Sequence, residues 1–157
     1  MQSNIDFISL FDIFIAIIYF LVIIGLAFII QSKNINKCPE YKYFTKGLIA
    51  KLTGVIAFCL VYVFYYGGGD TVNYFLGSKA LVGVLFQDFE KGIAVIFNTD
   101  SYLNSWYSFN PETGFPPHYM WKDALTFSVS RFTSPFYILA SGSFLVTSFF
   151  TAIFSYL

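Results

Sequence analysis

Residues 9–30 form a nearly unbroken apolar run, in which Asp12 is the only charged residue. This segment constrains the fold more than any other part of the chain, because about 20 apolar residues in a helix cross the roughly 30 Å hydrocarbon core of a bilayer. The preceding residues include Asp6 but no lysine or arginine, and no small-residue cleavage site follows, so the pattern is not that of a secretory signal. The sequence therefore predicts a transmembrane helix over residues 9–30.

Two further apolar segments, 47–66 and 133–157, are also predicted to cross the membrane. At the start of the third, Ser134 is expected to cap the helix and Pro135 to occupy its first turn. We therefore expect an all-α, polytopic helical membrane protein, with three transmembrane helices in a single membrane domain of residues 1–157. Because the last apolar run continues to Leu157, we also expect this domain to be the N-terminal part of a longer protein.

Composition supports this class and excludes others. Hydrophobic residues make up 57% of the chain and charged residues only 11%, whereas soluble domains carry roughly 25% charged residues. Nine basic and nine acidic residues give no net charge, which leaves no basic surface for nucleic acid. The phosphate-binding, dinucleotide-binding, serine-hydrolase and zinc-protease motifs of soluble enzymes are missing from the sequence.

Lysine placement predicts the orientation of these helices. The short segment 31–46 contains four lysines against a single glutamate, and the N-terminus contains only acidic residues. Because positively charged loops stay inside, we expect 31–46 to be cytoplasmic, and the N-terminus and residues 67–132 to be outside.

The predicted outer segment has two parts. Residues 78–91 show a helical period, with Leu81, Val82, Leu85, Phe86 and Phe89 on one face, which is typical of a helix lying in the membrane interface. Residues 92–132 form an aromatic outer loop with three prolines. Long loops of this kind are typical of lids or binding loops.

Asp70 follows three consecutive glycines at the end of the second predicted span. One interpretation is structural: Asp70 is the N-cap of the next helix, and Gly68 and Gly69 let the chain turn. The other is functional: the glycines admit a ligand, and Asp70 acts as a general base for a sugar hydroxyl or positions a metal-bound pyrophosphate. A divalent metal is compatible with this second interpretation, but we expect no other cofactor and no metal-binding motif.

Three further residues of the outer segment are candidates for substrate binding. Arg131, just before the third span, is either an interfacial anchor or a clamp for a lipid phosphate. Lys122 and His118 are candidates to assist it. His118 is the only histidine, which excludes a histidine-based metal site.

The stretch "YYGGGDTVNYF" resembles the front of polysaccharide polymerases of the EpsG type. More loosely, it is similar to polyprenyl-phosphate-dependent membrane glycosyltransferases of the GT-C class. The segment "SRFTSPFYILASGSF" resembles the start of the next span in related bacterial membrane proteins, and the likeness covers roughly residues 60–157. The resemblance implies that Asp70 is the acidic active-site residue of the first outer loop and that 78–91 is the interfacial helix that follows it.

These observations lead to a functional hypothesis. We expect a protein of glycan assembly in the bacterial inner membrane, which binds a lipid-linked sugar at the outer interface and transfers or polymerises it. The alternative is a non-catalytic accessory subunit of a larger membrane protein complex, and a transporter fragment is a third, weaker possibility. The expected partners are membrane lipid, a lipid-linked sugar and other membrane proteins.

Overall fold

The computed structural model describes residues 7–97 and 105–157, and every regular element within them is helical. The elements in chain order are α1 (Leu10–Asn34), the 3-10 helix η1 (Pro39–Tyr43), α2 (Phe44–Leu60), the π-helix η2 (Val61–Tyr65), α3 (Asp70–Gln87), α4 (Phe89–Phe97), the 3-10 helix η3 (His118–Trp121), α6 (Ala124–Leu139) and α7 (Phe144–Phe154). This confirms the predicted all-α class.

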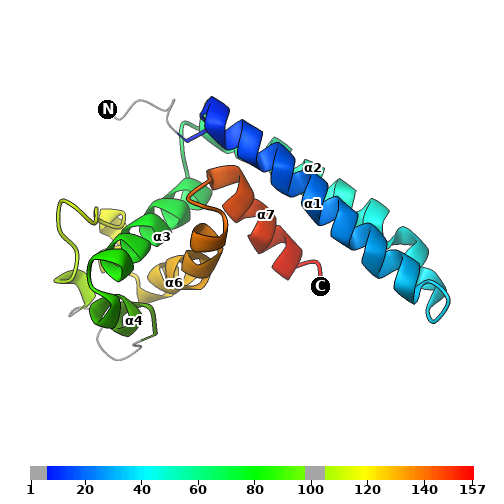
Figure 1. Cartoon of the computed structure of the whole chain (residues 1–157). Helices are drawn as coiled ribbons and strands as arrows, with labels where there is room; N and C mark the ends of the chain where they lie inside the picture. Colours follow the sequence, from blue (N-terminus) through cyan, green and yellow to red (C-terminus); the bar gives the residue numbers. More distant parts are fainter. Residues whose placement is uncertain (1–6, 98–104) are drawn as a thin grey trace.

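Helices α1 and α2 run side by side as a long hairpin, and α7 lies along it (Figure 1). The continuous helical segments Leu10–Asn34 and Pro39–Tyr65 are both long and apolar enough to cross a membrane. At 1.5 Å per residue, α1 is about 37 Å long. The predictions of span-length helices at 9–30 and 47–66 are therefore confirmed.

The third predicted span, 133–157, is not one helix. Helix α6 begins at Ala124, where the Asp123 carboxylate accepts from the backbone N–H groups of Leu125 and Thr126. It ends at Leu139, and α7 then leaves at an angle of 114°. The turn is made by Ser141 and Gly142, with φ values of 51° and 77°. The pair is a broken span or a re-entrant loop, so the described residues contain two candidate spans, or three if α6 and α7 count together.

The predicted helix start at Ser134 and Pro135 is also wrong, because both residues lie inside α6. Proline lacks a backbone N–H, so Pro135 leaves the carbonyl of Arg131 without its usual helical partner. The Ser134 hydroxyl donates to that carbonyl at 2.7 Å. The Ser134–Pro135 pair therefore lies inside the helix, where the serine hydroxyl satisfies the carbonyl that the proline leaves without a backbone donor.

Helix α3 differs from the predicted interfacial helix 78–91. It begins at Asp70 and stops at Gln87, because Asp88 is extended and its carboxylate accepts from the N–H of Lys91 at the start of α4. Leu81 and Val82 are buried within the protein, whereas Phe86 and Phe89, expected on the same face, are exposed. The periodicity reflected packing against other helices, and both the boundaries and the single apolar face were wrong.

A hydroxyl cluster fixes α3 against α6. The Ser78 hydroxyl lies 3.0 Å from the carbonyl of Ser130 and 2.6 Å from the Thr133 hydroxyl, and all three residues are buried. Gly77 lies beside Ser130 so closely that a Cβ would overlap its side chain. Small residues let the two backbones approach, and the hydroxyls then satisfy each other in the apolar contact.

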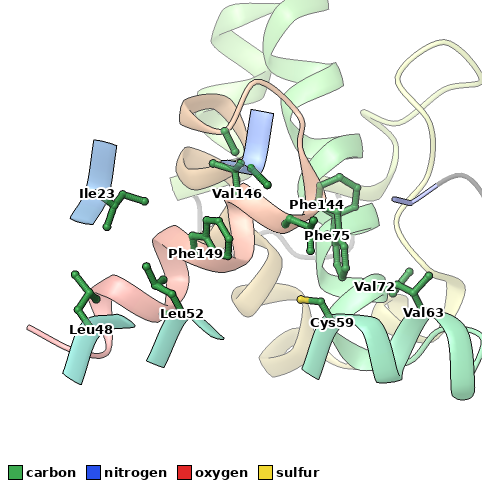
Figure 2. Packing of buried hydrophobic residues seen from close by; sticks show 14 of the residues in the cluster. Ile23, Leu48, Leu52, Cys59, Val63, Val72, Phe75, Phe144, Val146 and Phe149 are labelled. Atoms are coloured by element: carbon green, nitrogen blue, oxygen red, sulfur yellow. The ribbon is translucent and has the colours of Figure 1, made fainter. Parts of the chain in front are cut away.

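Two apolar clusters form the core. The larger one joins the α1–α2 hairpin, α7 and the start of α3; Figure 2 shows Val146 and Phe149 of α7 among side chains of these helices. The rings of Phe75 and Phe144 meet edge to face with centroids 5.3 Å apart. The smaller cluster lies between α3, α4 and α6.

The described part of the aromatic loop packs onto α3 and α6. The rings of Trp106 and Trp121 are 4.6 Å apart, and Phe109 lies edge to face with Phe127 of α6. At Gly83, a Cβ would lie only 2.6 Å from the carbonyl oxygen of Thr113, so this loop rests directly on the α3 backbone. Residues 98–104 of the predicted loop lie outside the described residues.

Candidate functional site

The triple glycine gives the chain a backbone path that other residues rarely adopt. Gly67, Gly68 and Gly69 have φ values of 67°, 134° and 139°, a region that favours glycine because it has no Cβ. The π-helix η2 comes just before them, and the Gly68 N–H donates to the Tyr62 carbonyl at 2.9 Å. Such π-helical turns occur preferentially at functional sites.

This loop borders a pocket of about 670 Å³, here called the Asp70 pocket. Its lining residues are Phe7, Tyr62, Tyr66, Gly67, Gly68, Gly69, Asp70, Val72, Asn73 and Leu76. The structure therefore brings the predicted Gly68, Gly69 and Asp70 together in one cavity, next to an amide and two tyrosines that the sequence did not single out.

Asp70 is the first residue of α3 and is exposed; Gly69 is the N-cap. The interpretation of Asp70 as the N-cap is therefore wrong, although a carboxylate in the first helical turn still interacts favourably with the helix dipole. Because Asp70 is exposed and lines the pocket, its carboxylate can be reached by a ligand there.

Two phenols lie within the field of this carboxylate. Tyr119 is 41% exposed, and the partial burial of its ring raises the pKa of the phenol above 10.0; a hydrogen bond with Asn73 acts against this, and the negative charge of Asp70 adds to the rise. Burial likewise raises the pKa of Tyr74, and Asp70 and then Asp123 reinforce the effect. Tyr119 belongs to the aromatic loop. Both phenols are neutral hydrogen-bond donors at physiological pH.

Arg131 lies elsewhere on α6. Its guanidinium carbon is 4.8 Å from the centroid of the Phe127 ring, and its Nη2 donates to the Ser105 hydroxyl at 3.4 Å. It is not among the residues that line the Asp70 pocket. These contacts connect α6 to the aromatic loop.

His118 is the first residue of η3 and Lys122 is its C-cap, and both lie outside the Asp70 pocket. The His118 ring stacks near Trp121 with centroids 6.4 Å apart, and Lys122 is exposed. The structure therefore separates these two residues and Arg131 from the pocket that contains Asp70.

A second polar pocket, missed by the sequence analysis, adjoins the first. It measures about 340 Å³ and is called the Asp12 pocket; it shares Phe7 and Leu76 with the Asp70 pocket. It also contains Lys79 of α3 and Ser141, Gly142 and Ser143 at the α6–α7 turn. The available signal was Asp12 itself, since an acidic residue within a predicted span is a functional candidate.

Metal ligands are sparse near either pocket. Within residues 7–97 and 105–157, no group of three or more histidine, cysteine or acidic side chains could hold a metal ion. A divalent ion at Asp70 would therefore take its other ligands from a phosphate group or from water, as Mg²⁺ commonly does.

Comparison with known proteins places no further constraint on this site: no protein-family model, curated protein or solved structure matches the chain. The resemblance to polysaccharide polymerases and membrane glycosyltransferases therefore stays a hypothesis, carried by the residues around Asp70.

Proposed function

We propose that this chain belongs to the glycan-assembly machinery of the bacterial inner membrane, and that it binds a lipid-linked sugar at the outer interface and transfers or polymerises it. The observation that carries the proposal is the Asp70 pocket, where an exposed carboxylate stands beside a glycine loop at the end of a span-length helix. This is the position at which a carrier lipid would present its headgroup.

The polar groups of the pocket suit a sugar phosphate. The Asp70 carboxylate accepts hydrogen bonds from sugar hydroxyls, and the Asn73 amide both donates and accepts. The first amide groups of α3 lack helical partners and carry the positive end of the helix dipole, which favours a phosphate. Because the glycines at 67–69 have no side chains, the backbone of this loop can approach the ligand closely.

Asp70 is the proposed general base. As an acceptor hydroxyl attacks the anomeric carbon, its proton passes to the Asp70 carboxylate and a new C–O bond forms. The bond between the anomeric carbon and the phosphate oxygen breaks, and its electron pair leaves with the carrier phosphate. Arg131, Lys122 and His118, predicted as phosphate or substrate contacts, are not required in this scheme.

The test is the lipid that copurifies with the protein. Protein is purified in mild detergent from its native membranes, and its lipids are identified by mass spectrometry. Wild type is expected to retain polyprenyl-phosphate-linked sugar, and Asp70→Asn to retain several-fold less. Glu90→Gln, which removes an exposed carboxylate on α4, is the matched control and is expected to behave as wild type.

The same preparation tests the alternative function. A stoichiometric protein partner, with no sugar-bearing lipid, would favour the accessory subunit and contradict the transferase. If Asp70→Asn and wild type retained the same amount of lipid-linked sugar, Asp70 would not be part of the binding site.

A further inference from the structure

The Asp12 pocket contains a buried carboxylate oxygen that lacks a donor. The Asp12 side chain is only 6% exposed, and its Oδ2 has no hydrogen-bond partner among the described residues. Buried polar atoms are nearly always hydrogen-bonded, and leaving one unsatisfied costs free energy. Since Asp12 lines the pocket, a donor that reaches the pocket floor would satisfy this oxygen.

Helix α7 begins beside the same carboxylate. The Ser143 hydroxyl and the backbone N–H groups of Phe144 and Leu145 lie close to the Asp12 carboxylate. These groups come from the N-cap and first turn of α7, an 11-residue helix. The first turn of α1, which contains Asp12, brings a second helix N-terminus to the pocket. The N-termini of two helices, whose first backbone N–H groups lack helical partners, therefore meet at the Asp12 pocket.

The rest of the pocket lining combines charged, hydroxyl and aromatic side chains. Lys79, which is exposed on α3, adds a cationic donor, and Ser9 and Ser141 add exposed hydroxyls. Phe75 and Tyr137 add aromatic surface, with their rings 5.2 Å apart. Carboxylate, ammonium and hydroxyl groups beside aromatic faces match a sugar ring, which has hydroxyls around its edge and C–H groups on its faces.

The Asp12 pocket adjoins the Asp70 pocket. Phe7 and Leu76 line both pockets, so the Asp12 pocket begins where the Asp70 pocket ends. A carrier lipid with two sugars presents the second beside the first, so a first sugar at Asp70 would place the second at the adjoining pocket.

From these contacts we propose that the Asp12 pocket is a second glycosyl subsite, in which Asp12 and Lys79 hold the sugar next to the one at Asp70. The inference rests on the proposed function, since it assigns a second sugar position to the same substrate. It adds a ligand class, and two binding residues, to a cavity that the Asp70 scheme does not use.

The experiment compares carrier lipids with different numbers of sugars. Full-chain protein is placed in vesicles that contain polyprenyl phosphate bearing no sugar, one hexose or two hexoses, in glucose and galactose series, and native mass spectrometry measures retention. Wild type is expected to retain the two-hexose lipid about tenfold better than the one-hexose lipid, the gain from added hydrogen bonds to charged groups. Asp12→Asn and Lys79→Gln are expected to lose this gain while retaining the one-hexose lipid as wild type does.

Two controls separate binding from folding. Lys46→Gln removes an exposed lysine of α2 that lines neither pocket, and is expected to keep the gain. Lys79 is itself exposed, so Lys79→Gln tests the subsite even if Asp12→Asn fails to fold because α7 loses its carboxylate.

The outcomes distinguish the two proposals. If wild type retains the one-hexose lipid better than bare polyprenyl phosphate but shows no gain from a second hexose, the subsite is wrong and the proposed function stands. The subsite is equally wrong if the gain persists in Lys79→Gln and in folded Asp12→Asn, as it would if water alone satisfied Asp12. If neither sugar-bearing lipid in either series exceeds bare polyprenyl phosphate, the proposed function itself fails.

Discussion

The hydroxyl oxygens of Ser78 and Thr133 lie 2.6 Å apart in the buried contact between α3 and α6. Each also bonds a helix carbonyl, so removing one hydroxyl leaves the other with fewer partners. We expect Ser78→Ala and Thr133→Val each to lower the free energy of unfolding by about 1 kcal/mol. Thermal and denaturant unfolding in detergent would measure the loss.

A double-mutant cycle tests whether the two hydroxyls act together. The loss for the double variant is expected to be smaller than the sum of the single losses, because contacting residues couple. Ser128→Ala is the control, since the exposed Ser128 hydroxyl bonds only the local Leu125 carbonyl among the described residues. Additive losses would show that the two hydroxyls contribute independently.

Gly69→Ala is expected to damage the Asp70 pocket more than Gly68→Ala does. Both positions have positive φ, so both substitutions introduce backbone strain. Only at Gly69 would the new Cβ also meet a side chain, 2.7 Å from the Tyr62 ring, whereas Gly68 has open space. Thermal unfolding and lipid retention of the two variants would measure the difference. Equal losses would mean that strain alone decides the effect.

The charge of the Asp70 carboxylate is expected to add to the pKa of the Tyr119 phenol. Burial first, and the Asp70 charge in addition, raise the pKa of Tyr119 above 10.0. Asp70→Asn should therefore lower this pKa only part of the way, because burial remains. Tyrosine NMR signals followed against pH, with Tyr119→Phe for assignment, would measure it. Asp88→Asn is the control and should leave it unchanged, because Asp88 is not among the charges acting on Tyr119.

The same shift gives stability a pH dependence of known sign. A pKa that is higher in the folded state means that the unfolded chain loses its proton first as the pH rises. The stabilisation is therefore complete below pH 10.0 and is lost as the pH rises from there through the folded pKa. Asp70→Asn should narrow the pH range between the unfolded and the folded pKa of Tyr119, over which this stabilisation is lost. An unchanged interval between the two pKa values would contradict the effect of the Asp70 charge on Tyr119.

The sequence predicted helices correctly where the length of an apolar run was sufficient evidence. Residues 9–30 and 47–66 had to be helical to satisfy their backbone groups in a membrane, and both are helices. The start of α6 was missed because hydropathy marks where apolar residues begin, whereas the helix begins nine residues earlier at the Asp123 cap, at Ala124 instead of residue 133. The "SGS" at 141–143 was a readable sign of the bend that divides 133–157.

The site residues likewise include some that the sequence predicts and some that it does not. Gly68, Gly69 and Asp70 are adjacent in sequence, so a local motif found them and the structure places them in one pocket. Asp12 of α1 and Lys79 of α3 line one pocket only through the tertiary fold, and no local sequence pattern encodes that arrangement. Arg131 was predicted to be an interfacial anchor or a clamp for a lipid phosphate, but the longer α6 places it against Phe127 and Ser105.

Orientation in the membrane is testable through the two native cysteines. Cys38 is half-buried in the segment predicted to be cytoplasmic, and Cys59 is fully buried in α2. A membrane-impermeant maleimide should therefore label Cys38 in inside-out vesicles but not in intact cells, because lysine-rich loops stay inside. Cys59 should react only after unfolding. As a control, Lys91→Cys in a Cys38→Ser background places an exposed thiol on the predicted outer side, and it should be labelled in intact cells. Labelling of Cys38 from outside would reverse the topology and place both pockets on the cytoplasmic face, where a carrier lipid would have to be loaded rather than polymerised.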